Sequence, residues 1–263
     1  MAQPSISRRD ALVAGFGCFA GACQRHAQPT PPETASALPA GNEPFGGLQF
    51  ATGGELTERE RGGTTVVLLH GFGASGDDLI SLAQALAHRR TRYIVPAAPI
   101  ELPNGGRAWW PMRGRPSYSA DQVLLVPSQK LEPARAAVQG LLSTINERFA
   151  PESLFLVGFS QGAMLALDVA LIASSSVARV AVLSGALLDD AATRLNEPRR
   201  VPPSVFVSHG RQDHVLAFEG AEHLVEAMKA RDFSVTFRPF DGGHEIPATT
   251  VQELKAFLFD AAG

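Results

Sequence analysis

The chain has 263 residues and a formal net charge of −3, and 45% of its residues are hydrophobic. Such a composition can form an apolar core, so we expect a folded protein with room for one α/β domain of about 200–250 residues. Nucleic-acid-binding proteins are usually far more basic, and no apolar run reaches the roughly 18 residues of a membrane span, so neither a nucleic-acid partner nor a transmembrane segment is expected.

Residues 1–23 have the pattern of an export signal. An arginine pair, Arg8-Arg9, precedes a 12-residue run of small and apolar residues, Ala11–Ala22, and this order is typical of a secretory signal. The segment Ser7–Leu12 resembles the twin-arginine export motif. The run ends in Ala20-Gly21-Ala22-Cys23, which resembles the lipobox of bacterial lipoproteins except that Ala20 replaces the usual leucine. We therefore expect an exported protein that is either periplasmic or membrane-anchored through a lipid on Cys23. The alternative is a cytoplasmic protein whose N-terminal segment is not a functional signal.

Residues 24–44 separate this signal from the folded part. They include five prolines among several Ala, Thr and Ser residues, a composition typical of an extended tether. Residues 45–263 form the predicted folded domain. Both cysteines, Cys18 and Cys23, precede it, which excludes a cysteine nucleophile, a disulfide framework and a thiolate zinc site from that domain.

Within the domain, apolar runs that read as strands alternate with amphipathic segments that read as helices. Strands are predicted over 64–69, 92–97, 153–157, 177–183, 205–208 and 234–240. Helices are predicted over 77–88, 128–149, 161–173, 218–230 and 251–259. Residues 98–127 read as a long loop, and 189–199 as an irregular connection. The alternation predicts an α/β fold with a mostly parallel central sheet and helices on both faces. Sites in such sheets form at the carboxyl ends of the strands.

Ser160 follows one of these strand ends. It lies in Gly158-Phe159-Ser160-Gln161-Gly162, between the apolar strand 153–157 and an apolar helix, and G-x-S-x-G in that context is typical of a nucleophilic serine on a sharp strand-to-helix turn. The flanking glycines permit the tight turn. The helix that follows directs the positive end of its dipole at the site. A glycine-rich turn without chemistry is the alternative.

A serine hydroxyl needs a base, and His244 is the candidate that the chain order favours. It follows the last predicted strand in Asp241-Gly242-Gly243-His244, where two glycines allow a tight loop. The acid that orients this histidine is expected between the two, after a strand, and Asp213 fits. Asp189 and Asp190 are weaker candidates, since they follow an earlier strand. Asp241 is near His244 in sequence, but its place at the end of the strand gives it an unfavourable geometry. His209, Asp213 and His214 have side chains that can bind a metal, but no third cluster completes a site, so no metal is expected.

The tetrahedral intermediate of acyl transfer also needs two backbone N–H donors. We expect them from Phe72, in the loop after the first predicted strand, and from Gln161, directly after the nucleophile. Because these residues act through their amides, their side chains are expected to matter less.

Together these motifs resemble the phospholipase/carboxylesterase family, the branch of the α/β-hydrolases with acyl-protein-thioesterase-like and lysophospholipase-like members. The resemblance runs from about residue 64 to 258 and rests on four motifs, His70-Gly-Phe-Gly, Gly-Phe-Ser160-Gln-Gly, His209-Gly-Arg-Gln-Asp213 and Gly-Gly-His244. It implies an α/β-hydrolase fold without a large lid domain. It also implies a cofactor-free serine esterase of small-molecule or lipid esters or thioesters, with a Ser160, Asp213 and His244 triad and Phe72 and Gln161 as oxyanion donors.

The long loop departs from the family pattern. Trp109-Trp110-Pro111 stands where the family commonly has Trp-Phe-Asp, which leaves the substrate preference undetermined. Trp109, Trp110 and Met112 form an apolar patch suited to an acyl chain or an aryl ring. The alternative is that one indole lies in the core and the other covers the edge of the sheet.

The sequence therefore predicts a serine hydrolase that works through an acyl-enzyme. An acyltransferase that uses the same triad, and a non-catalytic surface lipoprotein that retains the fold, are the alternatives. The acyl-chain length and the oligomeric state are not predicted.

Overall fold

The structure is a computed structural model, and it describes residues 48–57, 59–112, 117–119, 123–172, 176–198 and 201–260. All of these lie in the unit Ala37–Gly263. The predicted export signal with Cys23 and the tether over 24–44 lie outside the described residues. Within the described ranges, no helix combines the length and the apolar character that crossing a membrane requires.

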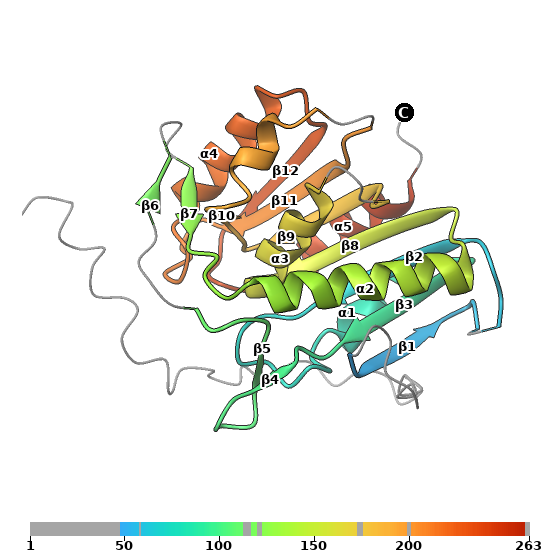
Figure 1. The fold of residues 1–263 in the computed structure, drawn as a ribbon. Helices are drawn as coiled ribbons and strands as arrows, with labels where there is room; N and C mark the ends of the chain where they lie inside the picture. The colour runs from blue at the N-terminus through green and yellow to red at the C-terminus, as the bar shows by residue number, and fades with distance from the viewer. Residues whose placement is uncertain are drawn as a thin grey trace, which may run out of the picture. The chain divides into compact units, whose positions relative to one another are not determined.

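A seven-stranded sheet forms the centre of the domain (Figure 1). Its order is β1 (Phe50–Gly54), β3 (Thr91–Pro96), β2 (Thr64–Leu69), β8 (Ser153–Phe159), β9 (Arg179–Leu183), β11 (Ser204–Gly210) and β12 (Val235–Phe240). Strand β1 is antiparallel to β3, and every other neighbouring pair is parallel. The predicted mostly parallel sheet is therefore confirmed, with β1 as an additional edge strand.

Helices cover both faces of this sheet, as the alternating pattern predicts. One apolar core cluster includes side chains of α2 (Glu132–Phe149), α3 (Gln161–Ala170) and α4 (Phe218–Lys229), and a second includes those of α1 (Ile80–Ala85) and α5 (Ala248–Phe259). Figure 1 shows α2 and α3 in front of the sheet and α1 and α5 behind it. Every residue of α3 is buried, which follows from a sequence that is apolar on nearly all sides.

The long connection between β3 and α2 differs from the predicted loop. It contains four short strands, β4 (Ile100–Glu101), β5 (Arg107–Ala108), β6 (Ser117–Tyr118) and β7 (Leu124–Val126). Strand β7 pairs in parallel with β10 (Leu187–Leu188), which lies more than 60 residues later in the chain. The irregular connection over 189–199 contains the 3₁₀ turn Thr193–Asn196. Strands of two or three residues are too short to show the alternating pattern of a strand, and β10 also depends on a partner far along the chain, so local patterning does not reveal them.

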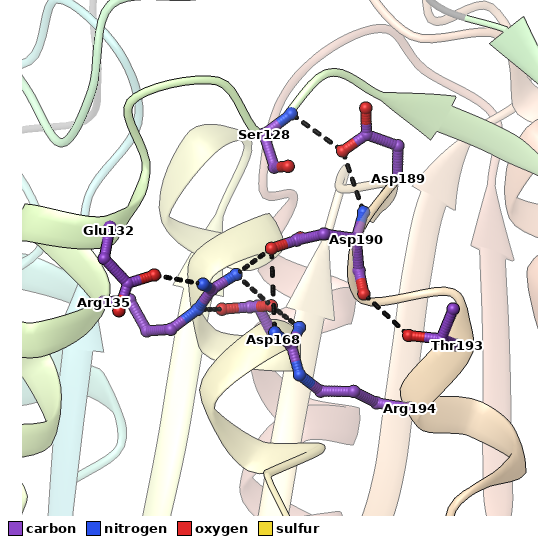
Figure 2. Close-up of polar contacts among 8 residues, drawn as sticks. All are labelled: Ser128, Glu132, Arg135, Asp168, Asp189, Asp190, Thr193 and Arg194. Atoms are coloured by element: carbon purple, nitrogen blue, oxygen red, sulfur yellow. Dashed lines mark hydrogen bonds and ion pairs between the residues drawn. The ribbon is translucent and has the colours of Figure 1, made fainter.

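An ion cluster joins α2, α3 and the segment after β10 (Figure 2). Arg135 of α2 binds the fully buried carboxylate of Asp168 in α3, with 2.7 Å between Nε and Oδ2. Arg194 reaches the other oxygen of Asp168 at 2.6 Å, and Asp190 binds Arg135 at 2.5 Å. Hydrogen bonds to Asp168 raise the pKa of the Arg135 guanidinium above its usual value, so the arginine stays charged. The cluster fixes the helix that begins directly after Ser160.

Candidate active site

Ser160 occupies the sharp turn between β8 and α3. Its φ of 52° and ψ of −116° lie in a region that residues with a side chain rarely adopt. A Cβ on Gly158 would come within 2.3 Å of the Gly162 carbonyl oxygen, and one on Gly162 within 2.1 Å of the Leu69 carbonyl oxygen. Both glycines are therefore required by close backbone approach, as the sequence analysis expects.

His244 and Asp213 meet at the ends of β12 and β11. Nδ1 of His244 lies 2.7 Å from Oδ2 of Asp213. The two loops pack tightly, since a Cβ on Gly210 would come within 2.2 Å of the Gly243 carbonyl oxygen. The imidazole of His244 also packs against the ring of Phe159, with 4.9 Å between the centroids, and Phe159 directly precedes Ser160. The structure thus brings the three predicted triad residues to the same edge of the sheet.

The Asp213 carboxylate is buried and fully engaged. Its Oδ1 accepts hydrogen bonds from the amides of Val215 and Leu216, at 2.8 and 2.9 Å. Burial raises the pKa of this carboxyl group, but hydrogen bonds from His209 and His244 and the charge of His244 outweigh burial and hold the pKa below its usual range. An ionised Asp213 accepts a hydrogen bond from Nδ1–H of His244, and in the neutral imidazole this leaves Nε2 without a proton and able to act as a base.

The other candidate acids have different partners. Asp189 accepts a hydrogen bond from the amide of Ser128, and Asp190 binds Arg135 in the ion cluster. Asp241 is exposed and pairs with Arg211. Of the carboxylates that sequence reasoning considers, Asp213 is therefore the one in contact with His244.

His209 is a second imidazole on Asp213 that sequence reasoning considers only as a metal ligand. It is buried, and its Nε2 lies 3.2 Å from Oδ2 of Asp213 and 3.0 Å from the Leu216 carbonyl oxygen. Two acceptors around Nε2 place the proton on that nitrogen. Among the described residues, no group of three or more His, Cys, Asp or Glu side chains is arranged to hold a metal ion.

The two predicted oxyanion donors flank Ser160. Gly71, whose peptide bond carries the Phe72 amide, lies so close that a Cβ on it would be 3.4 Å from Ser160 Cβ. Gln161 is the first residue of α3, where backbone N–H groups have no partner within the helix. The side chain of Phe72 is half exposed, so it is free of the core.

The side chain of Gln161 does not behave as expected. It is fully buried, with Oε1 accepting a hydrogen bond from the Trp109 amide at 2.9 Å and Nε2 donating one to the Trp110 carbonyl oxygen at 2.8 Å. Both of its polar groups bind the long connection, a pair of contacts that the sequence does not predict. A glutamine at the start of an otherwise apolar helix is the sequence signal that could have indicated this.

The two indoles lie in the core. Trp109 is 1% and Trp110 0% exposed, and both belong to the apolar cluster around α2 and α3. The sequence left open whether the indoles line a substrate pocket or whether one lies in the core and the other covers the edge of the sheet. The structure places both indoles in the core. Met112 is partly buried and packs against the same cluster.

Known proteins of one family are similar to this chain over most of its length. The family model described as Phospholipase/Carboxylesterase matches residues 57–261. A probable carboxylesterase of Oryza sativa subsp. japonica is 27% identical over 73% of this chain and 76% of its own length. Acyl-protein thioesterase 1 of Gibberella zeae is 25% identical over 74% of this chain and 88% of its own.

Solved structures resemble the chain over most of its length. The crystal structure of esterase PE8 aligns with a TM-score of 0.68 and 26% identity, covering 80% of this chain and 97% of the esterase. A carboxylesterase from Mesorhizobium loti aligns with a TM-score of 0.65 at 17% identity, covering 86% of this chain and all of that protein. At 17% identity the likeness concerns the fold alone.

Proposed function

Because the chain belongs to the phospholipase/carboxylesterase family and is a carboxylic ester hydrolase, we propose that Ser160, His244 and Asp213 carry out the hydrolysis through an acyl-enzyme. The observation that carries this proposal is the 2.7 Å contact between His244 Nδ1 and Asp213 Oδ2 beside the strained turn at Ser160. Small or acyl-chain esters and thioesters are the proposed substrates.

The first half of the reaction acylates Ser160. His244 Nε2 takes the hydroxyl proton as the serine oxygen attacks the ester carbonyl carbon, and ionised Asp213 stabilises the imidazolium. The amides of Phe72 and Gln161 donate hydrogen bonds to the developing oxyanion. When the carbonyl re-forms, the bond to the alcohol or thiol breaks, and the leaving group takes the proton from His244.

The second half returns the enzyme to its starting state. Water attacks the acyl carbonyl and gives a proton to His244 Nε2, and a second tetrahedral intermediate uses the same two amides. Its collapse releases the acid, and the Ser160 oxygen recovers its proton from His244. Each half-reaction thus uses the imidazole once as a base and once as an acid.

A fluorophosphonate probe tests the nucleophile. We expect the probe to label Ser160 in the wild-type chain and to leave Ser160→Ala unlabelled. Ester hydrolysis by that variant should fall by about 10⁴-fold or more, because a serine nucleophile and its base act as a unit. Labelling or full hydrolysis that survives in Ser160→Ala would exclude the proposed nucleophile.

A screen of acyl lengths on matched esters and thioesters then defines the substrate class. Adding an alcohol or an amine to the same reactions, with analysis of the products, tests the acyltransferase alternative. If water is the acceptor, we expect free acid as the product at every acceptor concentration. A transfer product that grows with acceptor would favour acyl transfer, and inactivity on the whole panel would favour a binding role.

We also propose that the protein is exported through the signal over residues 1–23. The support is the order of arginine pair, apolar run and small residues before Cys23. The mass of the mature N-terminus tests it: cleavage before an acylated Cys23 indicates a lipoprotein, and cleavage without acylation indicates a soluble exported form. An intact N-terminus on protein recovered from the cytoplasm would contradict export.

A further inference from the structure

We infer that the side chain of Gln161, acting through Trp109 and His70, is a positioning device that holds the two oxyanion amides in register. The inference rests on the proposed function, since it concerns the Phe72 and Gln161 amides that the mechanism uses. It assigns a role to three buried polar side chains that do not contact the substrate.

The protonation of His70 can be deduced from its neighbours. The Ala98 backbone N–H, which can only donate, lies 2.9 Å from His70 Nε2. Nε2 therefore accepts and carries no proton, so the ring proton is on Nδ1. Nδ1 lies 2.8 Å from the Gly71 carbonyl oxygen and donates to it. Burial also lowers the pKa of His70, in keeping with a neutral ring.

The hydrogen bond from His70 orients the Phe72 amide. A peptide unit is planar and trans, so the carbonyl of Gly71 and the N–H of Phe72 point in opposite directions from one rigid plane. Fixing the Gly71 carbonyl oxygen toward His70 thus directs the Phe72 N–H to the other side of the plane. The 3.4 Å approach of a Cβ on Gly71 to Ser160 Cβ puts this peptide beside the nucleophile.

A chain of hydrogen bonds leads from His70 to the second donor. The carbonyl oxygen of His70 accepts from Trp109 Nε1 at 2.9 Å, and the Trp109 amide donates to Gln161 Oε1 at 2.9 Å. Gln161 carries the other oxyanion amide on its own backbone. The loop after β2 and the start of α3 are therefore linked through one tryptophan, which is bound at both its backbone and its side chain.

The side-chain amide of Gln161 is held in one orientation because both its oxygen and its nitrogen make hydrogen bonds. With Nε2 donating to the Trp110 carbonyl oxygen at 2.8 Å, the amide plane has two fixed contacts and one orientation. Gln161, Trp109 and His70 are each at most 1% exposed, so removal of a partner leaves a buried polar group without water to replace it. We expect the Trp109 segment, and with it the Gly71–Phe72 peptide, to shift when the side chain of Gln161 is lost.

The substitution Gln161→Met tests this inference. It keeps the backbone amide and the length of the side chain but removes both hydrogen-bonding groups. We expect kcat for ester hydrolysis to fall by about 10- to 100-fold with KM changed less than about threefold, since one whole oxyanion donor is worth about 10²–10³ in kcat. Amide hydrogen exchange at Phe72 should become faster.

Val138→Ala in α2 is the matched control. It creates a small cavity in the same core cluster and lowers stability without touching this link, so kcat and exchange at Phe72 should stay as in the wild type. Should Gln161→Met not fold, His70→Asn and His70→Leu replace it. Asparagine can still donate in place of Nδ1, so we expect a larger loss of kcat in His70→Leu than in His70→Asn.

The two readouts separate this inference from the proposed function. Unchanged kcat and unchanged Phe72 exchange in Gln161→Met would overturn the inference, as would equal losses in Val138→Ala. Hydrolysis that survives in Ser160→Ala would instead overturn the proposed mechanism. In that case Phe72 exchange, which needs no catalysis, still decides whether Gln161 orders this peptide.

Discussion

Ser160 adopts a strained backbone conformation because hydrogen bonds fix the peptide groups on both sides of it. Its N–H donates to the Leu183 carbonyl oxygen of β9 at 2.9 Å, and its own carbonyl oxygen accepts from the amides of Ala163 and Met164. A non-glycine residue with positive φ costs about 1–3 kcal/mol and persists where the surroundings over-determine it. This conformation places the half-buried Ser160 directly before the first amides of α3.

The glycines around this turn provide a test at single-residue scale. We expect Gly162→Ala to lower the free energy of unfolding by about 3 kcal/mol or more, because the new methyl group would lie 2.1 Å from the Leu69 carbonyl oxygen. Gly140→Ala in α2 is the control, since a Cβ there meets no atom within 4 Å, and it should raise stability by about 0.5–1 kcal/mol. Urea unfolding of both variants measures the difference, and a neutral Gly162→Ala would contradict the tight turn.

The same scale separates what the sequence could and could not predict about the site. Ser160, Asp213 and His244 could be chosen because each follows a strand and the chain order of the three is characteristic. The role of the Gln161 side chain could not, because its partners lie about 50 residues earlier, in a connection without a regular pattern. The contact between His209 and the Asp213 carboxylate could not be predicted for a similar reason, since it depends on the conformation of the loop after β11.

Helix α3 raises a problem at the scale of elements, because it is buried on all sides yet contains an aspartate. The carboxylate of Asp168 is completely buried and is balanced by Arg135 and Arg194 from two other segments (Figure 2). A buried charge is tolerated when paired and costly when left alone. The cluster therefore fixes how α2 and the segment after β10 pack on the helix that follows Ser160.

Removal of Arg135 tests this packing. We expect Arg135→Met to lower the free energy of unfolding by about 3–5 kcal/mol, since it removes the arginine that binds both oxygens of the buried Asp168 carboxylate. Arg90→Met is the control, because Arg90 pairs with Glu152 on the surface, where both side chains are more than half exposed, and such pairs contribute about 0–1 kcal/mol. If chemical denaturation gave equal losses of unfolding free energy for the two substitutions, the buried cluster would stabilise the fold no more than a surface ion pair.

Elements differ in how well the sequence predicts them, for a physical reason. The inner parallel strands are short apolar runs buried on both faces, so β2 and β8 stand out from composition alone. Strand β1, with the sequence Phe-Ala-Thr-Gly-Gly, has two glycines and is held by pairing with β3. Its formation depends on this pairing, which the local sequence does not show.

The whole molecule brings together loops that lie far apart in the sequence. The loop after β2 carries the Phe72 amide, β8 ends beside Ser160, and Asp213 and His244 follow β11 and β12. Because these strands are parallel, their carboxyl ends meet at one edge of the sheet. The order of strands and helices thus determines the location of the site, whereas the long connection after β3 determines how rigidly it is held.

Acid pH should reveal how the site contributes to the stability of the whole chain. The pKa of Asp213 lies below its usual range in the folded state, chiefly because hydrogen bonds from His209 and His244 outweigh burial. An aspartate of this kind stabilises the native state above its unfolded pKa of about 3.9, and the contribution is lost as the pH falls toward the folded pKa. The effect belongs to the whole molecule, since global unfolding releases the carboxylate.

Asp213→Asn lacks this titration and isolates it. We expect the free energy of unfolding of the wild type, relative to this variant, to be higher at pH 5 than at pH 3 and to fall by about 1 kcal/mol between them. Urea unfolding of both proteins at half-unit pH steps gives the difference curve, in which every other carboxylate cancels. A difference that stays constant over this range would mean that Asp213 has an ordinary pKa and that the hydrogen bonds from His209 and His244 do not favour its ionised form.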